Sequence, residues 1–398
     1  MSAAPGPSAF DTALHQTTEQ IRAAAASGQS LCIRGGGSKN FYGTLATGQA
    51  PLALLDTRPL RGITSYQPSE LVVTVRAGTP LAELEAALAE KGQCLPFEPP
   101  HFGAQRVKLA SQPPHLNAPP GEATVGGMVA AGLAGPARAS VGGVRDYVLG
   151  VSMLNGRAEP LTFGGQVMKN VAGYDVSRLM VGALGTLGVL TELSLKVLPV
   201  LPGEATLRFD MPQAQALQQL NQWGGQPLPL NASCWVHADG ASTLYVRLRG
   251  ALAAVEAACK SMGGQRMDAQ QAARDWALCR NQQLPWFAAR GARALWRVSL
   301  PHAALALDLP AEFEPPLVEW HGAQRWYQLP SGQGALLRQA ATKVGGHATL
   351  FRADGAQTES AESRFDAIAP PLLRIMRQLK QEFDPAGIFN PGRLHADF

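Results

Sequence analysis

Charged residues, cysteines and long apolar runs are scarce in this sequence, and each scarcity argues against a class of protein. Charged side chains make up 16% of 398 residues and the net charge is +4, too small and scattered for a nucleic-acid-binding surface. The five cysteines lie far apart without a C-x-x-C pair, which argues against a disulfide framework and against a cysteine-bound metal or iron–sulfur cluster. No apolar run reaches the length of a membrane span. The N-terminus lacks the basic and apolar regions of a signal peptide, so we expect a cytoplasmic setting.

Glycine, in contrast, is abundant, with 42 residues beside 30 prolines. The chain is longer than the size at which a single hydrophobic core usually stops growing, so we expect two domains. Helix-like and strand-like patterns are mixed along its whole length, which predicts an α+β fold.

The residues from Lys169 to Val197 contain the first of three glycine-rich stretches. Asp175 suits the N-cap of a short helix, and the alternation of apolar and polar residues from Thr191 onward predicts a strand. Between them, Gly185-Thr186-Leu187-Gly188 exposes bare backbone that a ligand could approach closely. On this stretch alone, a tight helix-to-strand turn is the better explanation.

A second glycine-rich stretch, residues 34–43, follows a short predicted strand at residues 31–33. Consecutive glycines let successive N–H groups point into one concavity, which suits a pyrophosphate. The stretch lacks the G-K-[ST] ending of a Walker A loop, and it opens no helix as a Rossmann fingerprint would.

The third stretch, residues 124–135, predicts a helix with one face made of glycine and alanine. Each glycine costs a helix about 1 kcal/mol relative to alanine. Such a face is therefore expected where something flat or bulky lies against the backbone. Close packing of another helix is the alternative explanation.

These three stretches and the tail Asn390-Pro391-Gly392 make the chain resemble flavoproteins of the vanillyl-alcohol oxidase/para-cresol methylhydroxylase fold. Residues 97–102, 164–170 and 284–287 are similar, more specifically, to the FAD-binding E subunits of glycolate oxidase. The resemblance implies an α+β fold, with a two-subdomain FAD-binding domain and a cap domain that contains an antiparallel sheet. The implied segments are a disordered tail at 1–10, the FAD-binding domain at 11–200, the cap at 201–345 and a C-terminal segment at 346–398 that returns to the flavin.

The resemblance also implies cofactor-binding residues. FAD is expected to be non-covalent, because the first loop lacks the histidine to which covalent members of the fold attach it. The implied flavin-binding residues are Arg34, Gly35, Gly36, Gly37, Ser38, Lys39, Asn40, Thr124, Gly126, Gly127, Ala130, Arg145, Asp146, Gly185, Gly188, Val189 and Asn390.

One departure from the resemblance concerns catalysis. Catalytic 2-hydroxy-acid dehydrogenases of this fold carry the motif H-x-G-D-G-N-x-H, whereas residues 346–352 keep His347 and lose the aspartate and the second histidine. We therefore expect no metal site. If the chain catalyses by itself, His347 is the candidate base and Arg297 or Arg352 the candidate carboxylate ligand.

The leading hypothesis is an FAD-binding subunit of a multi-subunit glycolate oxidase. Hydride from glycolate would then reduce a flavin in a sister subunit, and electrons would pass to an iron–sulfur subunit. Any membrane association would go through these partners. Two alternatives stay open: a self-sufficient FAD-dependent 2-hydroxy-acid oxidoreductase, and a non-catalytic scaffold subunit. The intact glycine stretches argue against the scaffold.

Overall fold

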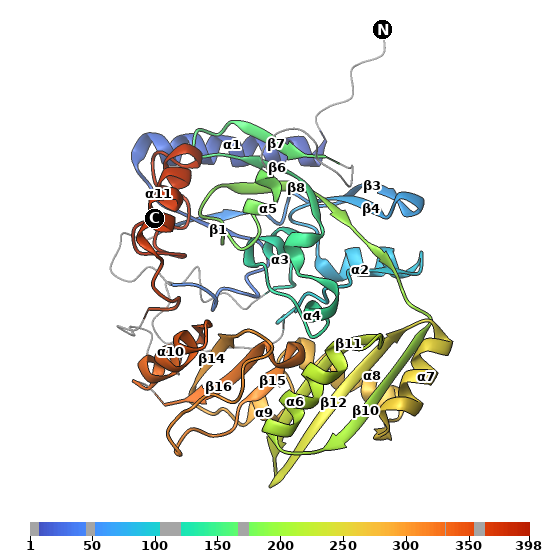
Figure 1. Cartoon of the computed structure of the whole chain (residues 1–398). Coiled ribbons are helices and arrows are strands. Elements are labelled where there is room, and N and C mark those ends of the chain that lie inside the picture. Colours follow the sequence, from blue (N-terminus) through green and yellow to red (C-terminus); the bar gives the residue numbers. More distant parts are fainter. Residues whose placement is uncertain (1–7, 45–51, 104–120, 166–174, 331, 354–362) are drawn as a thin grey trace.

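The computed structural model describes residues 8–44, 52–103, 121–165, 175–330, 332–353 and 363–398. Three features of the sequence lie partly outside these ranges: the expected tail 1–10, residues 103–122, which we expected to be an exposed insertion, and the motif 164–170. The described residues form two units, each built around one large antiparallel sheet, and Figure 1 shows one unit above the other.

The first unit contains a five-stranded sheet in the order β3-β4-β8-β6-β7. Its strands are β3 (Ile63–Gln67), β4 (Val72–Arg76), β6 (Val148–Leu154), β7 (Pro160–Gly164) and β8 (Val189–Lys196). β8 is the central strand, and most of its side chains are buried because both faces of the sheet are covered. The strand predicted from Thr191 onward is therefore present, and β6 and β7 form a hairpin around Asn155-Gly156, a pair of residues typical of such turns.

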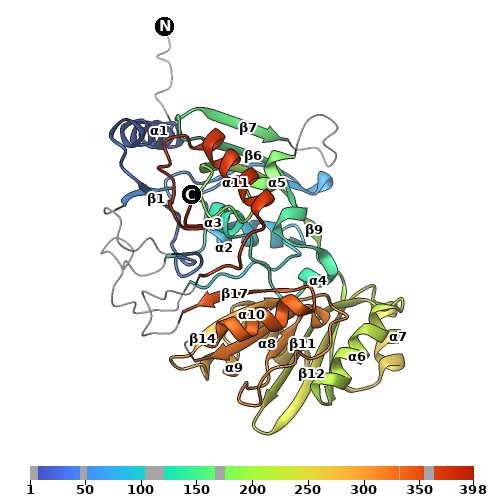
Figure 2. The same ribbon diagram turned by 60° about the vertical axis from the view of Figure 1, so that its left-hand side comes forward.

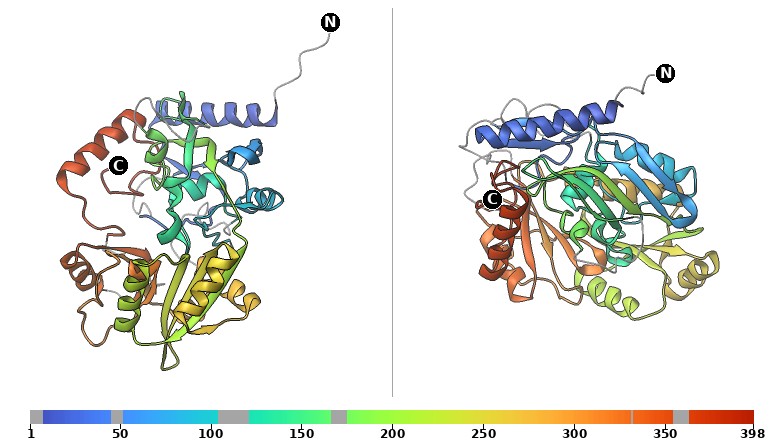
Figure 3. Two further views of the ribbon diagram at one scale, coloured as in Figure 1. Left: turned by 45° about the vertical axis from the view of Figure 1, so that its right-hand side comes forward. Right: turned by 90° about the horizontal axis from the view of Figure 1, so that it is seen from above.

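Helices and short strand pairs complete the first unit. They are α1 (Ala9–Ser27), β1 (Leu31–Arg34), β2 (Ala53–Asp56), η1 (Pro68–Glu70), α2 (Leu81–Ala89), β5 (Gln93–Cys94), α3 (Val125–Ala131), α4 (Arg138–Val141), η2 (Val144–Asp146), α5 (Val176–Leu179) and β9 (Leu198–Pro199). α1 lies along the outer side of this unit (Figure 3). It begins inside the segment 1–10 that was expected to be disordered, because Ser8 and Asp11 form a capping box at its N-terminus.

The second unit contains an eight-stranded antiparallel sheet in the order β13-β10-β12-β11-β15-β16-β14-β17. Its elements are β10 (Gly203–Asp210), α6 (Gln213–Gly224), β11 (Leu230–Ala238), β12 (Ala241–Gly250), α7 (Leu252–Met262), β13 (Gln265–Arg266), α8 (Ala269–Arg280), α9 (Pro285–Ala288), β14 (Ala294–Ser299), β15 (Leu317–Glu319), η3 (Trp320–Gly322), β16 (Gln324–Leu329), α10 (Gly334–Lys343) and β17 (His347–Arg352). α6, α7 and α10 pack on one face of this sheet. α8 packs on the other face, beside residues of the first unit.

The end of the chain returns to the first unit. After β17, helix α11 (Pro370–Phe383) leads back beside the first sheet, as Figure 2 shows. The tail then pairs with β1, since Leu31 N–H donates to Ile388 O at 2.7 Å and Asn390 N–H donates to Leu31 O at 3.0 Å. β17 is the edge strand of the second sheet, so that sheet extends beyond the expected cap boundary at residue 345.

The α+β fold with antiparallel sheets is confirmed. Among the described residues, no helix combines the length and the apolar character that crossing a membrane requires.

Candidate flavin site

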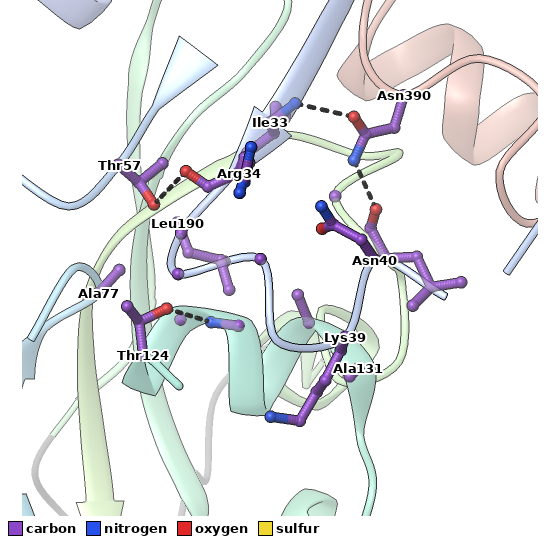
Figure 4. A pocket seen from close by; sticks show the side chains of 18 of the residues that line it. Ile33, Arg34, Lys39, Asn40, Thr57, Ala77, Thr124, Ala131, Leu190 and Asn390 are labelled. Atoms are coloured by element: carbon purple, nitrogen blue, oxygen red, sulfur yellow. Dashed lines mark hydrogen bonds between the residues drawn. The ribbon is translucent and has the colours of Figure 1, made fainter. Parts of the chain in front are cut away.

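A cavity open to solvent, with about 710 Å³ of empty space, lies in the first unit, where the three glycine-rich stretches meet the tail (Figure 4). Its wall consists of Ile33, Arg34, Gly35, Gly36, Gly37, Ser38, Lys39, Asn40, Thr57, Ala77, Thr124, Gly126, Gly127, Ala130, Ala131, Leu184, Gly185, Gly188, Leu190, Asn390 and Arg393. Residues far apart in the sequence thus share one wall. Ile33 of β1 and Asn390, for example, are 357 positions apart.

Helix α3 forms one side of the cavity, and its neighbouring residues Gly126 and Gly127 are glycines for different reasons. Thr124 is its N-cap and accepts a hydrogen bond from Gly127 N–H at 3.2 Å. A side chain on Gly126 would meet Ala77 Cβ at 2.7 Å, so Gly126 is required by packing inside the protein. A side chain on Gly127 would meet no atom within 4 Å except Thr124 Oγ1 at 3.1 Å, and would enter the cavity.

The first loop approaches the backbone of another segment. A Cβ on Gly36 would lie 1.6 Å from Glu122 O, a distance that no side chain can adopt. Gly121 N–H donates to Gly36 O at 2.6 Å, so the loop is held against the chain that enters α3. The glycines at this position allow two backbones to touch beneath the cavity.

Asn390 holds the cavity together through both ends of its amide. Its Oδ1 accepts from Ile33 N–H at 2.8 Å, and its Nδ2 donates to Leu184 O at 2.7 Å. Asn390 is buried, so both bonds are shielded from water. It joins β1 to the turn before β8, as the dashed lines in Figure 4 show.

Two cationic residues of the wall are withdrawn from water, the buried Lys39 and the partly buried Arg393. Burial lowers the pKa of Lys39 to about 7, and its Nζ donates a hydrogen bond to Ser38 Oγ at 3.3 Å. Burial also lowers the pKa of Arg393, whose Nη2 reaches Tyr42 O at 3.2 Å. None of the described lining residues carries a carboxylate. A buried cation without an anion is costly, so the cavity is suited to an anionic ligand.

The cavity wall includes most of the residues implied by the resemblance, but not all of them. Val189 is fully buried in the core of the first unit, outside the wall. Arg145 and Asp146 line a second, adjacent space. Sequence reasoning missed seven wall residues: Ile33, Thr57, Ala77, Ala131, Leu184, Leu190 and Arg393. Four of them, Ile33, Ala131, Leu184 and Leu190, directly follow or precede a predicted residue in the sequence. Thr57 and Ala77 follow the separate strands β2 and β4, and no local sequence pattern links these strands to the glycine-rich stretches.

The three candidate catalytic residues lie on β14 and β17 of the second unit, outside the wall of the flavin cavity. Arg297 Nη2 donates to Tyr42 Oη at 3.1 Å. His347 is the first residue of β17 and keeps an exposed edge, and partial desolvation of its ring, followed by the charge of Arg297, lowers its pKa. Arg352 is buried, with its guanidinium 3.5 Å from the Phe41 ring centroid, and burial lowers its pKa to about 9.

The residues of the cavity wall are chemically suited to FAD. Its pyrophosphate is a dianion that would neutralise Lys39 and Arg393, and its flat ring needs the open face at Gly127 and Ala130. The described residues contain no group of three or more His, Cys, Asp or Glu side chains that could hold a metal ion.

Comparisons with known proteins identify the family of the chain. Residues 14–108 match the family model "FAD binding domain", and residues 361–394 match "FAD linked oxidases, C-terminal domain". The fold is similar to that of a solved alkyldihydroxyacetonephosphate synthase, with a TM-score of 0.62, 14% identity and coverage of 95% of this chain and 74% of the other. Fold, cavity and family models together define an FAD-dependent oxidoreductase.

Two curated relatives narrow the class. The chain is 44% identical to the glycolate oxidase subunit GlcE of Escherichia coli (strain K12), over 95% of this chain and 96% of that protein. It is 30% identical to the glycolate oxidase subunit GlcD of Bacillus subtilis (strain 168), over 42% of this chain and 31% of that protein. The chain belongs to the GlcE family of glycolate oxidase subunits.

Proposed function

We propose that this chain is the FAD-binding subunit of a multi-subunit complex that oxidises glycolate to glyoxylate. Glycolate loses two electrons and two protons in this reaction, and FAD supplies a two-electron acceptor when it is bound. The observation that carries the proposal is the cation-lined cavity in a member of the GlcE family. A sister flavin subunit and an iron–sulfur subunit would pass the electrons onward.

The chain's own residues support a dependence on partners. The five cysteines are all free thiols, spread over both units, so a cluster would have to belong to another subunit. Free thiols also suit the reducing cytoplasm, where we propose that the complex works. The FAD-binding domain at 11–200 and the cap from 201 onward remain part of this proposal, with β17 added to the cap, so that the returning segment begins after Arg352.

A self-sufficient 2-hydroxy-acid oxidoreductase is the second candidate, and one observation favours it. Ser299 pairs with His347, and Arg297 pairs with Thr349, so Arg297 and His347 are diagonal neighbours on β14 and β17. A base and a carboxylate ligand could therefore act together. His347 is exposed, however, and although Asp366 lies near it, accepting from Ala348 N–H at 2.8 Å, the described residues contain no group of three or more His, Cys, Asp or Glu side chains that could hold a metal ion.

The test compares the isolated chain with the assembled complex. The FAD-loaded chain alone should keep its oxidised flavin spectrum in glycolate and in D-lactate, while the chain with both partners should reduce an artificial acceptor with glycolate. Rapid bleaching of the isolated chain would favour the self-sufficient enzyme. A correctly folded chain that never binds flavin, although the complex is active, would favour the scaffold.

A further inference from the structure

A second chamber lies next to the flavin cavity and has not been given a role. It is open to solvent, and its empty space, solvent included, is about 970 Å³. It is lined by Tyr42, Ala131, Gly132, Arg138, Gly143, Val144, Arg145, Asp146, Val181, Gly182, Leu184, Phe365 and Leu394. Ala131 and Leu184 belong to the walls of both spaces, so the chamber adjoins the cavity at the C-terminal end of α3.

Two arginines give the chamber its charge. Arg138 and Arg145 are both exposed, and no ion pair within the described part of the chain involves either of them. Asp146 is the acidic residue of the wall, and its Oδ2 already accepts a hydrogen bond from Gly143 N–H at 2.8 Å. The chamber therefore carries a net positive charge.

The positively charged side of the chamber is in contact with the second unit. The Arg138 guanidinium lies 4.5 Å from the centroid of the Trp320 ring, and Trp320 Nε1 donates to Gly135 O at 3.0 Å. Tyr42, another residue of the chamber wall, accepts from Arg297, whose Nε is buried without a hydrogen-bond partner in the described structure. The guanidinium of Arg297 is thus a third positive group, bonded to Tyr42 of the chamber wall.

We propose that the chamber is an anion site in which Arg138 and Arg145 bind the carboxylate of a small 2-hydroxy or 2-oxo acid. Arginine matches the planar geometry of a carboxylate through its fork of N–H donors. Tyr42, held by Arg297, faces the same space and positions the ligand beside the flavin. The inference rests on the proposed function for the identity of the acid, but not for the presence of the anion site.

The probe is oxalate, a planar carboxylate that a flavin cannot oxidise by hydride removal. We would titrate it into the full-length, FAD-loaded chain and follow the heat of binding and the flavin difference spectrum. The variants are Arg138→Met and Arg145→Met, which keep an unbranched side chain and remove the charge. Arg157→Met is the matched control, because Arg157 is exposed on the β6–β7 hairpin outside both spaces. FAD content and melting temperature show that each variant is folded.

Saturable binding of oxalate by the wild type is expected, weakened about 10- to 100-fold by each of the two chamber substitutions and unchanged by Arg157→Met. Equal binding by all four proteins would overturn the assignment of the arginines. Binding of sulfate as tight as that of oxalate, at the same ionic strength, would overturn the assignment to carboxylates. A wild-type chain that holds FAD but binds no oxalate would overturn the inference and leave the proposed function standing. That function fails separately, if the assembled complex does not oxidise glycolate.

Discussion

Lys39 provides a sharp test of how the protein holds its cofactor. Burial lowers the pKa of its ammonium from 10.5 to about 7, which corresponds to roughly 5 kcal/mol against the charged form. In the flavin-free chain the unfolded state therefore binds more protons than the folded state between pH 7 and pH 10.5. The free energy of unfolding of the flavin-free chain should rise with pH across this window.

A pyrophosphate beside Lys39 should reverse the effect of burial and return its pKa toward the ordinary value. Binding of FAD should then take up about half a proton at pH 7 and nearly one proton at about pH 8.5. The dissociation constant of FAD should accordingly increase with pH, by up to about tenfold per pH unit above pH 7. Lys39→Met, which keeps the length of the side chain, should abolish this dependence and weaken binding about 10- to 100-fold.

The assay is calorimetric titration of the flavin-free chain with FAD in buffers of different ionisation enthalpy, which reports the number of protons taken up. Lys91→Met is the control, because Lys91 is an exposed lysine of the same unit. The reasoning is refuted if the wild type binds FAD equally tightly at pH 7 and pH 9. It is equally refuted if Lys39→Met keeps the proton uptake of the wild type.

Three further outcomes are expected. Gly127→Leu should abolish flavin binding with little change in melting temperature. Gly126→Leu should unfold the first unit, because the new leucine side chain would collide with Ala77. Flavin content and melting curves of both variants check this. Acid precipitation of the holoprotein should release all flavin into the supernatant, and yellow colour left in the pellet would contradict non-covalent binding. Asn390→Ala removes two buried hydrogen bonds and should lower the free energy of unfolding by roughly 2–5 kcal/mol, measured by urea denaturation; a loss of flavin without a loss of stability would show instead that Asn390 contacts the cofactor.

The elements of the fold were predictable where one local pattern determined them. The alternation after Thr191 predicted β8, and the glycine and alanine residues after Thr124 predicted α3. The pairing of distant segments was not predictable in the same way. β17 lies beside β14 at the edge of the second sheet, and nothing in the local pattern of residues 346–352 distinguishes a cap strand from a segment of the flavin site.

In the candidate site, too, the sequence indicated which residues line the cavity but not which distant segments they contact. Sequence reasoning assigned seven glycines of the three stretches to the cofactor, but two of them, Gly36 and Gly126, are also required by close contact with Glu122 and Ala77. A sequence cannot separate these two causes, because both need the absence of a side chain. Asn390 was expected near the flavin ring and does line the cavity, yet both ends of its amide are engaged by the backbone of other segments.

The motif at residues 97–102, which linked the sequence to the E subunits, joins the two units of the molecule. Glu98 accepts from Arg247 Nη2 at 2.7 Å and 2.8 Å, and Pro99 O accepts from Arg280 Nε at 2.9 Å. Arg247 is almost fully buried, so removing Glu98 would leave a charge without a partner between the units. These contacts fix the cap sheet, with Arg297 and His347, relative to the proposed flavin cavity. The features that mark the subunit family therefore include the docking of the cap, and the position of any substrate in the arginine chamber depends on that docking.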